Sequence, residues 1–201
     1  IPGMSADILT LDGKKVSTNE MGELVMRKSS IGLTKSLWND DKRYIDNYWS
    51  VIKDYWVHGD LASRDADGHW YLHGRSDDTI KVSGKRIGPS ELESVIVKSG
   101  KAKEVAAVGI PDENKGSKII LSIVPAENND QKESFFEGLV IKDLGKSFKP
   151  DKVIFVKDLP KTRNMKIMRR VIKSCLTNQD PGDLSTLLNP ESVEEIKSHA
   201  I

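Results

Sequence analysis

The chain is poor in features that would tie it to a membrane, an oxidising compartment or a nucleic acid. Its single cysteine, Cys175, cannot form an intrachain disulfide bond, which fits a reducing compartment, so we expect a cytoplasmic protein. No apolar run approaches the roughly 20 residues that span a bilayer, and no signal-peptide pattern opens the chain. The net charge is only +1 across 201 residues, which argues against a dedicated nucleic-acid binder.

Familiar catalytic and metal-binding patterns are missing as well. The chain has no Walker-type phosphate loop. The segment Asp65-Ala66-Asp67-Gly68 begins like an EF-hand loop, but the further ligands and the bidentate glutamate are missing, which favours an ordinary turn. No metal site is predicted, because none of the histidines is spaced as a metal ligand with cysteine or paired acids: His58, His69, His73 and His199.

The composition, 37% hydrophobic and 30% charged, is typical of a globular protein with an ordinary core. Residues 1–76 alternate strand-like segments with turns, with Asp60 near a strand end and a short helix at 39–49. The half after residue 76 reads β-turn-β, α, β, β, α, β, α, which predicts an α+β fold with helices packed on a small β-sheet. In that half the last main helix is expected from Lys166 onward, and residues 180–201 suit a short helix packed on the outside.

The stretch Gly74–Glu93, GRSDDTIKVSGKRIGPSELE, combines two adjacent acids, a Ser-Gly turn and a helix start. The apolar residues around Ser83-Gly84 predict a short hairpin, and Pro89 predicts the first turn of a helix. Three basic residues crowd that turn: Lys81, Lys85 and Arg86. The pattern favours either a turn that contacts a phosphate or carboxylate, or a solvated basic turn.

A second basic stretch, Leu159–Arg170, holds five basic residues and no acid. It suits a solvated loop and helix face, and it also suits a loop that presents one lysine to a phosphate. A third possibility is a polyanion or RNA-binding module that uses residues 161–173. Aromatic residues interleaved with the basic ones, which such modules commonly use, are missing.

These stretches resemble two motifs of the acyl-adenylate-forming enzymes. Gly74–Glu93 is similar to the family's hinge motif and Leu159–Arg170 to its C-terminal lysine motif, while His58-Gly59-Asp60 is similar to its ribose motif, usually Thr-Gly-Asp. The run Lys166–Arg170 and the tail Gly182–Leu187 resemble the AMP-forming acetyl-CoA synthetases and their propionyl relatives. The resemblance implies a ligase that uses ATP with Mg²⁺ to convert acetate or propionate to an acyl-adenylate, from which the thiol of coenzyme A displaces AMP.

The resemblance also implies a division of the chain. Residues 1–76 would be the C-terminal remnant of a large N-terminal domain, and residues 77–201 the mobile C-terminal domain. The rest of the N-terminal domain would be a partner within the same chain, so this piece alone is expected to be inactive. A non-catalytic regulatory domain of the same fold remains an alternative.

The family's nucleotide-binding roles fall on three residues of this sequence. By resemblance, Asp60 would accept hydrogen bonds from the ribose hydroxyls and Arg75 would contact the same ribose. Arg86 would approach a nucleotide phosphate. All three side chains suit these contacts, since a carboxylate accepts with two oxygens and a guanidinium binds phosphate.

The remaining roles concern coenzyme A, domain movement and catalysis. Ser83 and Gly84 would line the path of the coenzyme A pantetheine arm, and Asp77 would be the hinge. Lys166 would be the catalytic lysine and, by resemblance, the target of inhibitory acetylation, because acetylation deletes its charge. The family usually has glycine before that lysine. Here the residue is Met165, which resists the positive φ that glycine permits.

Overall fold

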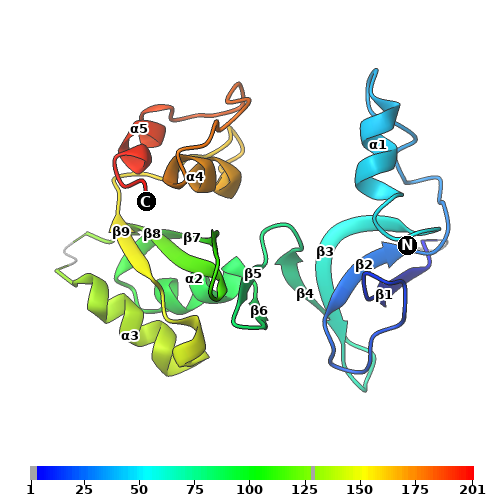
Figure 1. Cartoon of the computed structure of the whole chain (residues 1–201), viewed down its shortest axis with the longest axis horizontal. Helices are drawn as coiled ribbons and strands as arrows, with labels where there is room; N and C mark the ends of the chain where they lie inside the picture. The colour runs from blue at the N-terminus through cyan, green and yellow to red at the C-terminus, as the bar shows by residue number, and fades with distance from the viewer. Residues whose placement is uncertain (1–3, 128–129) are drawn as a thin grey trace. The chain divides into compact units, whose positions relative to one another are not determined.

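The computed structural model describes residues 4–127 and 130–201. The chain forms two compact units, Ile1–Asp77 and Asp78–Ile201. Figure 1 draws the first unit in blue to cyan and the second in green to red.

The first unit is built on an antiparallel four-stranded sheet in the order β1-β2-β3-β4. The strands are β1 (Ala6–Leu9), β2 (Gly22–Met26), β3 (Trp56–Arg64) and β4 (Trp70–Arg75). Helix α1 (Asp41–Tyr48) begins where the carboxylate of Asp40 accepts a hydrogen bond from the Arg43 amide. Its small core gathers four buried residues: Leu9, Val25, Ile52 and Val57.

Every tryptophan and tyrosine of the chain precedes residue 77. Some of these rings pack into the first unit: Trp56 is buried and its ring stacks on Tyr48 with a centroid distance of 5.2 Å and an interplanar angle of 4°. Trp38, in contrast, is exposed. The aromatic rings therefore include both core residues and surface residues.

The second unit contains a three-stranded sheet and a separate short hairpin. Strands β7 (Ala102–Asp112) and β8 (Gly116–Pro125) pair antiparallel, and β9 (Lys152–Phe155) pairs parallel to β8. The hairpin joins β5 (Ile80–Val82) to β6 (Lys85–Ile87). Its helices are α2 (Pro89–Lys98), α3 (Glu133–Leu144), α4 (Arg169–Leu176) and α5 (Glu191–Lys197), with a 3₁₀ turn at Lys146–Phe148.

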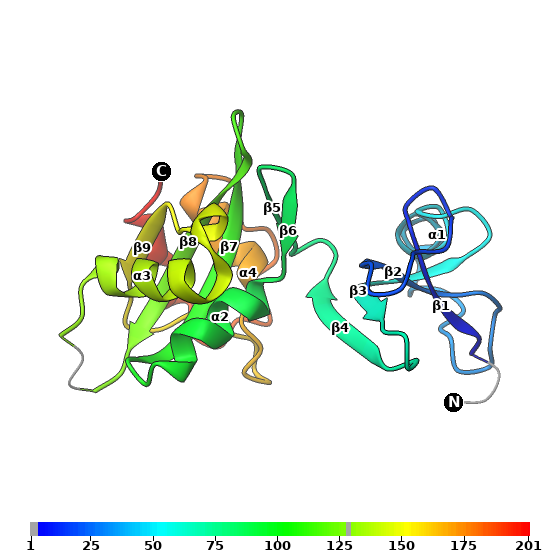
Figure 2. The same ribbon diagram turned by 90° about the horizontal axis from the view of Figure 1, so that it is seen from below.

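Helices cover both faces of the β7-β8-β9 sheet. Figures 1 and 2 show α2 and α3 on one face and α4 and α5 on the other. Side chains of β7 alternate between the two layers, so Val105 and Ala107 join the core under α2 and α3, while Ala106 and Val108 join the core under α4 and α5. This arrangement confirms the α+β fold that the sequence predicts.

Three details differ from the sequence-based expectations. Helix α4 begins at Arg169 rather than Lys166, because the Lys166 carbonyl accepts from the Thr162 amide and the Met168 amide donates to the Pro160 carbonyl. The tail helix α5 belongs to the core, since Ile196 is fully buried. Asp60 lies inside β3 rather than at a strand end. Within the described residues, no helix is long and apolar enough to cross a membrane.

Candidate functional site

In the first unit, β3 and β4 bring Asp60 and Arg75 together as register partners. The Asp60 Oδ2 atom lies 2.7 Å from Nδ1 of His58, and its Oδ1 atom lies 3.7 Å from an Arg75 terminal nitrogen. Arg75 also donates through Nε to Asp77, at 3.1 Å, and through a terminal nitrogen to the His58 carbonyl, at 3.2 Å. The two residues expected to bind the ribose therefore lie in one cluster of polar contacts with His58 and Asp77.

Gly59 makes this cluster possible. Its φ is +83°, a region that side chains of L-residues rarely adopt, and a Cβ atom there would lie 2.9 Å from both terminal nitrogens of Arg75. The guanidinium thus lies across the His58–Gly59 backbone. A recess of about 300 Å³ opens beside it, lined by residues that include Tyr48, His58, Gly59, Arg75 and Asp77.

The Ser83-Gly84 turn has positive φ at both residues, +50° and +80°, as a two-residue type I′ hairpin turn requires. The Ser83 amide donates to the Lys115 carbonyl at 2.8 Å. A Cβ atom at Gly84 would meet no heavy atom of the described chain within 4 Å. Backbone conformation, rather than crowding within the protein, therefore accounts for the glycine.

The hairpin separates apolar from basic side chains. Ile80 and Ile87 face the core, while Lys81 and Arg86 are register partners on the exposed side. Among the described residues, neither basic side chain has an acidic partner. Lys85 donates to the Ser147 hydroxyl at 3.1 Å. The hairpin thus presents cations to solvent. This fits both interpretations of the sequence, a turn that contacts an anion and a solvated basic turn.

Lys166 lies on a closed loop between Lys161 and Ile167, which pair as an isolated β-bridge. The Met165 amide donates to the Thr162 carbonyl at 2.8 Å, and the Lys166 amide donates to the Thr162 hydroxyl at 3.2 Å. Met165 adopts φ +61°, so methionine occupies the left-handed conformation that the family's glycine would favour. The unusual residue has not changed the backbone conformation expected there.

The Lys166 side chain is exposed, and in the described part of the chain its ammonium group has no acidic partner. A recess of about 550 Å³ lies beside it. The lining residues come from the loop and from the C-terminal tail: Thr162, Arg163, Asn164, Lys166, Ser185 and Thr186. An unpaired ammonium beside hydroxyl donors is suited to an anion.

Some residues around the loop were not singled out by the sequence. Asp158 and Glu104 bind the side chain of Lys161, and Asn189 binds the backbone on both sides of Pro160. No periodicity marks these positions. The only sequence signal was that Lys161 stands within the stretch Leu159–Arg170, which carries the family resemblance.

One group of side chains has the composition of a cation site, namely Asp65, Asp67 and His69 in the turn between β3 and β4. Asp65 already accepts hydrogen bonds from the His69 amide, at 2.8 Å, and from the Tyr71 hydroxyl, at 2.9 Å. These contacts are the ones that stabilise a turn. The geometry therefore suits the ordinary turn that the sequence favours.

The chain is similar to known proteins over nearly its whole length. Residues 91–166 match the family described as the AMP-binding enzyme C-terminal domain. The acetyl-coenzyme A synthetase of Methanothrix thermoacetophila is 39% identical over 203 residues, covering 98% of this chain and 31% of that protein. The acetyl-coenzyme A synthetase of Helicobacter pylori is 39% identical over 210 residues, with 98% and 32% covered. The chain thus spans about a third of the length of the curated relatives it matches.

Solved structures show the same fold. The acetoacetyl-CoA synthetase of Streptomyces lividans superposes with a TM-score of 0.85 at 22% identity, covering 96% of this chain and 30% of that one. An anthranilate CoA ligase in complex with anthranoyl-AMP superposes with a TM-score of 0.72 at 27% identity, with 84% and 32% covered. Residues 91–166 therefore carry the AMP-binding enzyme C-terminal domain, and the chain as a whole is similar to a C-terminal portion of acetyl-coenzyme A synthetases.

Proposed function

We propose that the chain is the C-terminal part of an AMP-forming ligase that joins acetate or propionate to coenzyme A through an acyl-adenylate. The observation that carries the proposal is Lys166, an exposed lysine with no acidic partner among the described residues, held on a closed loop above a recess. The 39% identity to acetyl-coenzyme A synthetases over 98% of the chain supports the choice of acid.

In the first half-reaction, a carboxylate oxygen of the acid attacks the α-phosphorus of MgATP and pyrophosphate leaves. Negative charge gathers on the oxygens around that phosphorus. The ammonium of Lys166 lies beside them in the proposed complex and stabilises this charge, as preorganised cations do in such reactions. Acetylation of Lys166 would remove the charge and stop this half-reaction.

The nucleotide is held by the cluster in the first unit. Asp60 has two carboxylate oxygens to offer the ribose hydroxyls, and Arg75 supports it from the neighbouring strand. The recess beside Arg75 gives the ribose a place to enter. Arg86, exposed on the β5-β6 hairpin, approaches a phosphate.

In the second half-reaction, the thiol of coenzyme A attacks the acyl carbon and AMP leaves. The turn Ser83-Gly84 lines the pantetheine path, and the open space at Gly84 keeps that path unobstructed. Asp77 is the proposed hinge, where a few dihedral angles absorb the rotation of residues 77–201 between the half-reactions. We infer that the enzyme acts in the cytoplasm.

The alternative of an RNA-binding segment at 161–173 is not favoured. Two of its basic residues are neutralised by carboxylates of the same chain: Lys161 lies against Asp158 and Glu104, and Arg169 binds Glu93. Such cations are not free to neutralise phosphates, which is the main source of affinity for nucleic acid.

The other alternative is a non-catalytic regulatory domain of the same fold. It predicts that removing the Lys166 side chain has no effect on catalysis.

The test is a chimera in which this chain replaces the matching third of the Methanothrix thermoacetophila synthetase. We expect Lys166→Ala to reduce acetate-dependent exchange of pyrophosphate into ATP by at least about 100-fold, while thioester formation from supplied acetyl-adenylate is spared. Lys173→Ala, an exposed lysine on α4, is the matched control and should leave both rates unchanged. Equal loss of both half-reactions in Lys166→Ala would refute the assigned role.

A further inference from the structure

Lys161 stands at the base of the Lys166 loop, which runs from Lys161 to Ile167. It is the one buried lysine among the described residues. Its ammonium lies 2.7 Å from Oδ1 of Asp158 and 2.7 Å from Oε2 of Glu104, on β7. Burial by itself lowers the pKa of Lys161, but the hydrogen bonds to these two carboxylates outweigh it and raise the pKa above its ordinary value. A buried charge needs such partners, because an unpaired one is costly to desolvate.

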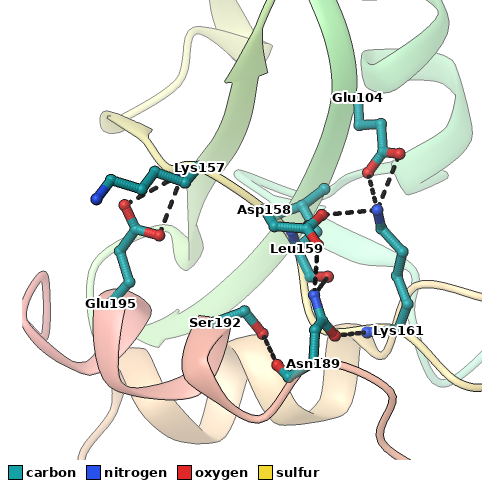
Figure 3. A network of polar contacts seen from close by, with 8 residues as sticks. All are labelled: Glu104, Lys157, Asp158, Leu159, Lys161, Asn189, Ser192 and Glu195. Atoms are coloured by element: carbon teal, nitrogen blue, oxygen red, sulfur yellow. Dashed lines mark hydrogen bonds and ion pairs between the residues drawn. The ribbon is translucent and has the colours of Figure 1, made fainter.

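Asn189 binds the same segment from the C-terminal tail (Figure 3). Its side-chain nitrogen donates to Oδ2 of Asp158 at 2.7 Å and to the Leu159 carbonyl at 2.8 Å, and its oxygen accepts from the Lys161 amide at 3.0 Å. The residue is buried, and both amide hydrogens and the oxygen are used. Asn189 therefore fixes the backbone immediately before the loop.

The contacts continue into helix α5 on one side and toward Lys166 on the other. Ser192 donates to the Asn189 carbonyl at 2.7 Å, and Glu195 accepts from the Lys157 amide at 3.1 Å (Figure 3). The Leu188 amide donates to the Lys161 carbonyl at 2.8 Å, and Leu187 pairs with Thr162. The tail thus runs alongside the loop stem.

The residues just before Leu187 reach the recess of Lys166. Ser185 and Thr186 line that recess together with residues of the Lys166 loop. A lysine side chain is long and flexible. Its ammonium group can be positioned precisely only if the backbone that carries it is fixed. The loop's own closing bonds fix its tip, whereas the contacts of Lys161 and Asn189 fix its stem.

We propose that Lys161, Asp158 and Asn189 are positioning residues that hold the stem of the Lys166 loop against β7 and the C-terminal tail. The inference rests on the proposed function for the catalytic role of Lys166. The positioning itself is a property of this chain and is measurable without catalysis. A displacement of about 1 Å at a catalytic group is enough to cost about 100-fold in rate.

Hydrogen exchange by NMR on the 201-residue chain tests the positioning. We expect Asn189→Ala and Lys161→Met to raise exchange at the Thr162, Met165 and Leu188 amides about 10-fold, while Val108 in β7 is unchanged. The backbone chemical shifts of Met165, which report its positive φ, should move toward unfolded values in both variants. Lys161→Arg keeps a cation between the two carboxylates and should restore most of the protection.

The controls separate positioning from general destabilisation. Asn114→Ala removes an exposed side-chain amide from the β7–β8 turn of the same unit. It should leave hydrogen exchange at all of these backbone amides unchanged. If either main variant does not fold, Asp158→Asn, which keeps the shape of the side chain, should still raise exchange about 3-fold in the loop. Unchanged loop exchange, or an equal rise at Val108, would overturn the proposal.

A second measurement keeps this inference distinct from the proposed function. In the chimera, Asn189→Ala should slow adenylate formation about 10-fold or more and spare thioester formation from supplied acetyl-adenylate. If Lys166→Ala has no effect on adenylate formation, the proposed function fails while the exchange results still decide the positioning. If Lys166→Ala acts as expected and Asn189→Ala slows both half-reactions equally, the positioning role fails.

Discussion

Arg169 and Glu93 form a two-pronged ion pair between the start of α4 and helix α2. The Arg169 Nε atom donates to Oε1 at 2.9 Å and a terminal nitrogen donates to Oε2 at 2.7 Å. Glu93 also accepts from the Ala107 amide, and Arg169 lies 3.8 Å from Asp78. One guanidinium thus joins helices on opposite faces of the sheet to the first residue of the second unit.

This geometry predicts that Arg169→Lys destabilises the second unit. An ammonium cannot reproduce two parallel hydrogen bonds, so we expect the free energy of unfolding to fall by about 1–3 kcal/mol in urea denaturation. Arg163→Lys is the matched control, because Arg163 is exposed on the Lys166 loop. It should change the free energy of unfolding by less than about 0.5 kcal/mol. Equal effects of the two substitutions would contradict the prediction.

Asp158 should make stability depend on acid pH. Partial burial raises its pKa, but hydrogen bonds from Lys161, the Leu159 amide and Asn189 outweigh it and bring the pKa below its ordinary value of 3.8. A carboxyl group whose pKa is lowered by folding stabilises the protein above its unfolded pKa, and this stabilisation is lost as pH falls through the folded pKa.

The difference in unfolding free energy between the wild type and Asp158→Asn isolates this effect, since other acids contribute equally to both proteins. We expect the difference to be constant above about pH 5 and to shrink below about pH 4. Urea denaturation at a series of pH values measures it. A difference that stays constant down to pH 2 would show that Asp158 does not titrate as described.

Met165 should tolerate glycine but not a β-branched residue. Its φ of +61° strains any side chain, and a β-branched one most. We expect Met165→Gly to change the unfolding free energy by less than about 1 kcal/mol and Met165→Val to lower it by about 1–2 kcal/mol. Similar stability of the two variants would show that the loop does not hold this conformation in solution.

Gly59 and Gly68 provide a matched pair in the first unit. Both have positive φ, +83° and +88°, but a Cβ atom at Gly59 would collide with Arg75, whereas one at Gly68 meets nothing within 4 Å. We expect Gly68→Ala and Gly59→Ala each to lower the unfolding free energy by about 1 kcal/mol, because the atoms that a Cβ at Gly59 would meet are the flexible end of the Arg75 side chain, which can move aside. In the chimera, only Gly59→Ala should weaken nucleotide binding.

Asp77→Pro tests the proposed hinge. Proline fixes φ, so we expect thioester formation from supplied adenylate to slow at least about 10-fold in the chimera while adenylate formation continues. Asp77→Ala is the control, because it also removes the ion pair with Arg75 but leaves the backbone free. The hinge assignment fails if both substitutions have the same effect on the thioester step.

Local signals predicted much of the second unit. Pro89 indicated a helix start, and α2 begins at Pro89, with Glu91 accepting a hydrogen bond from the Gly88 amide. The Ser83-Gly84 turn and the apolar strands that became β7 and β8 were also evident. In each case the residues that specify the structure lie within a few positions of it.

Contacts between distant residues were not predictable in this way. The start of α4 shifted to Arg169 because Lys166 and Met168 use their backbone groups to pair with the loop stem. Asn189 binds Asp158 across 31 positions, and neither residue belongs to a pattern of strand or helix. Such pairings depend on the packing of α5 on the sheet, which no local propensity encodes.

The confinement of the tryptophans and tyrosines to the first unit has an optical consequence. Because all tryptophans and tyrosines precede residue 77, the first unit dominates the near-ultraviolet fluorescence, and the only aromatic residues of the second unit are weakly emitting phenylalanines. Trp56 stacks on Tyr48, and Tyr48 lines the recess beside Arg75. A nucleotide that enters the recess would therefore quench or shift the emission of Trp56, which gives the chain a built-in reporter of occupancy.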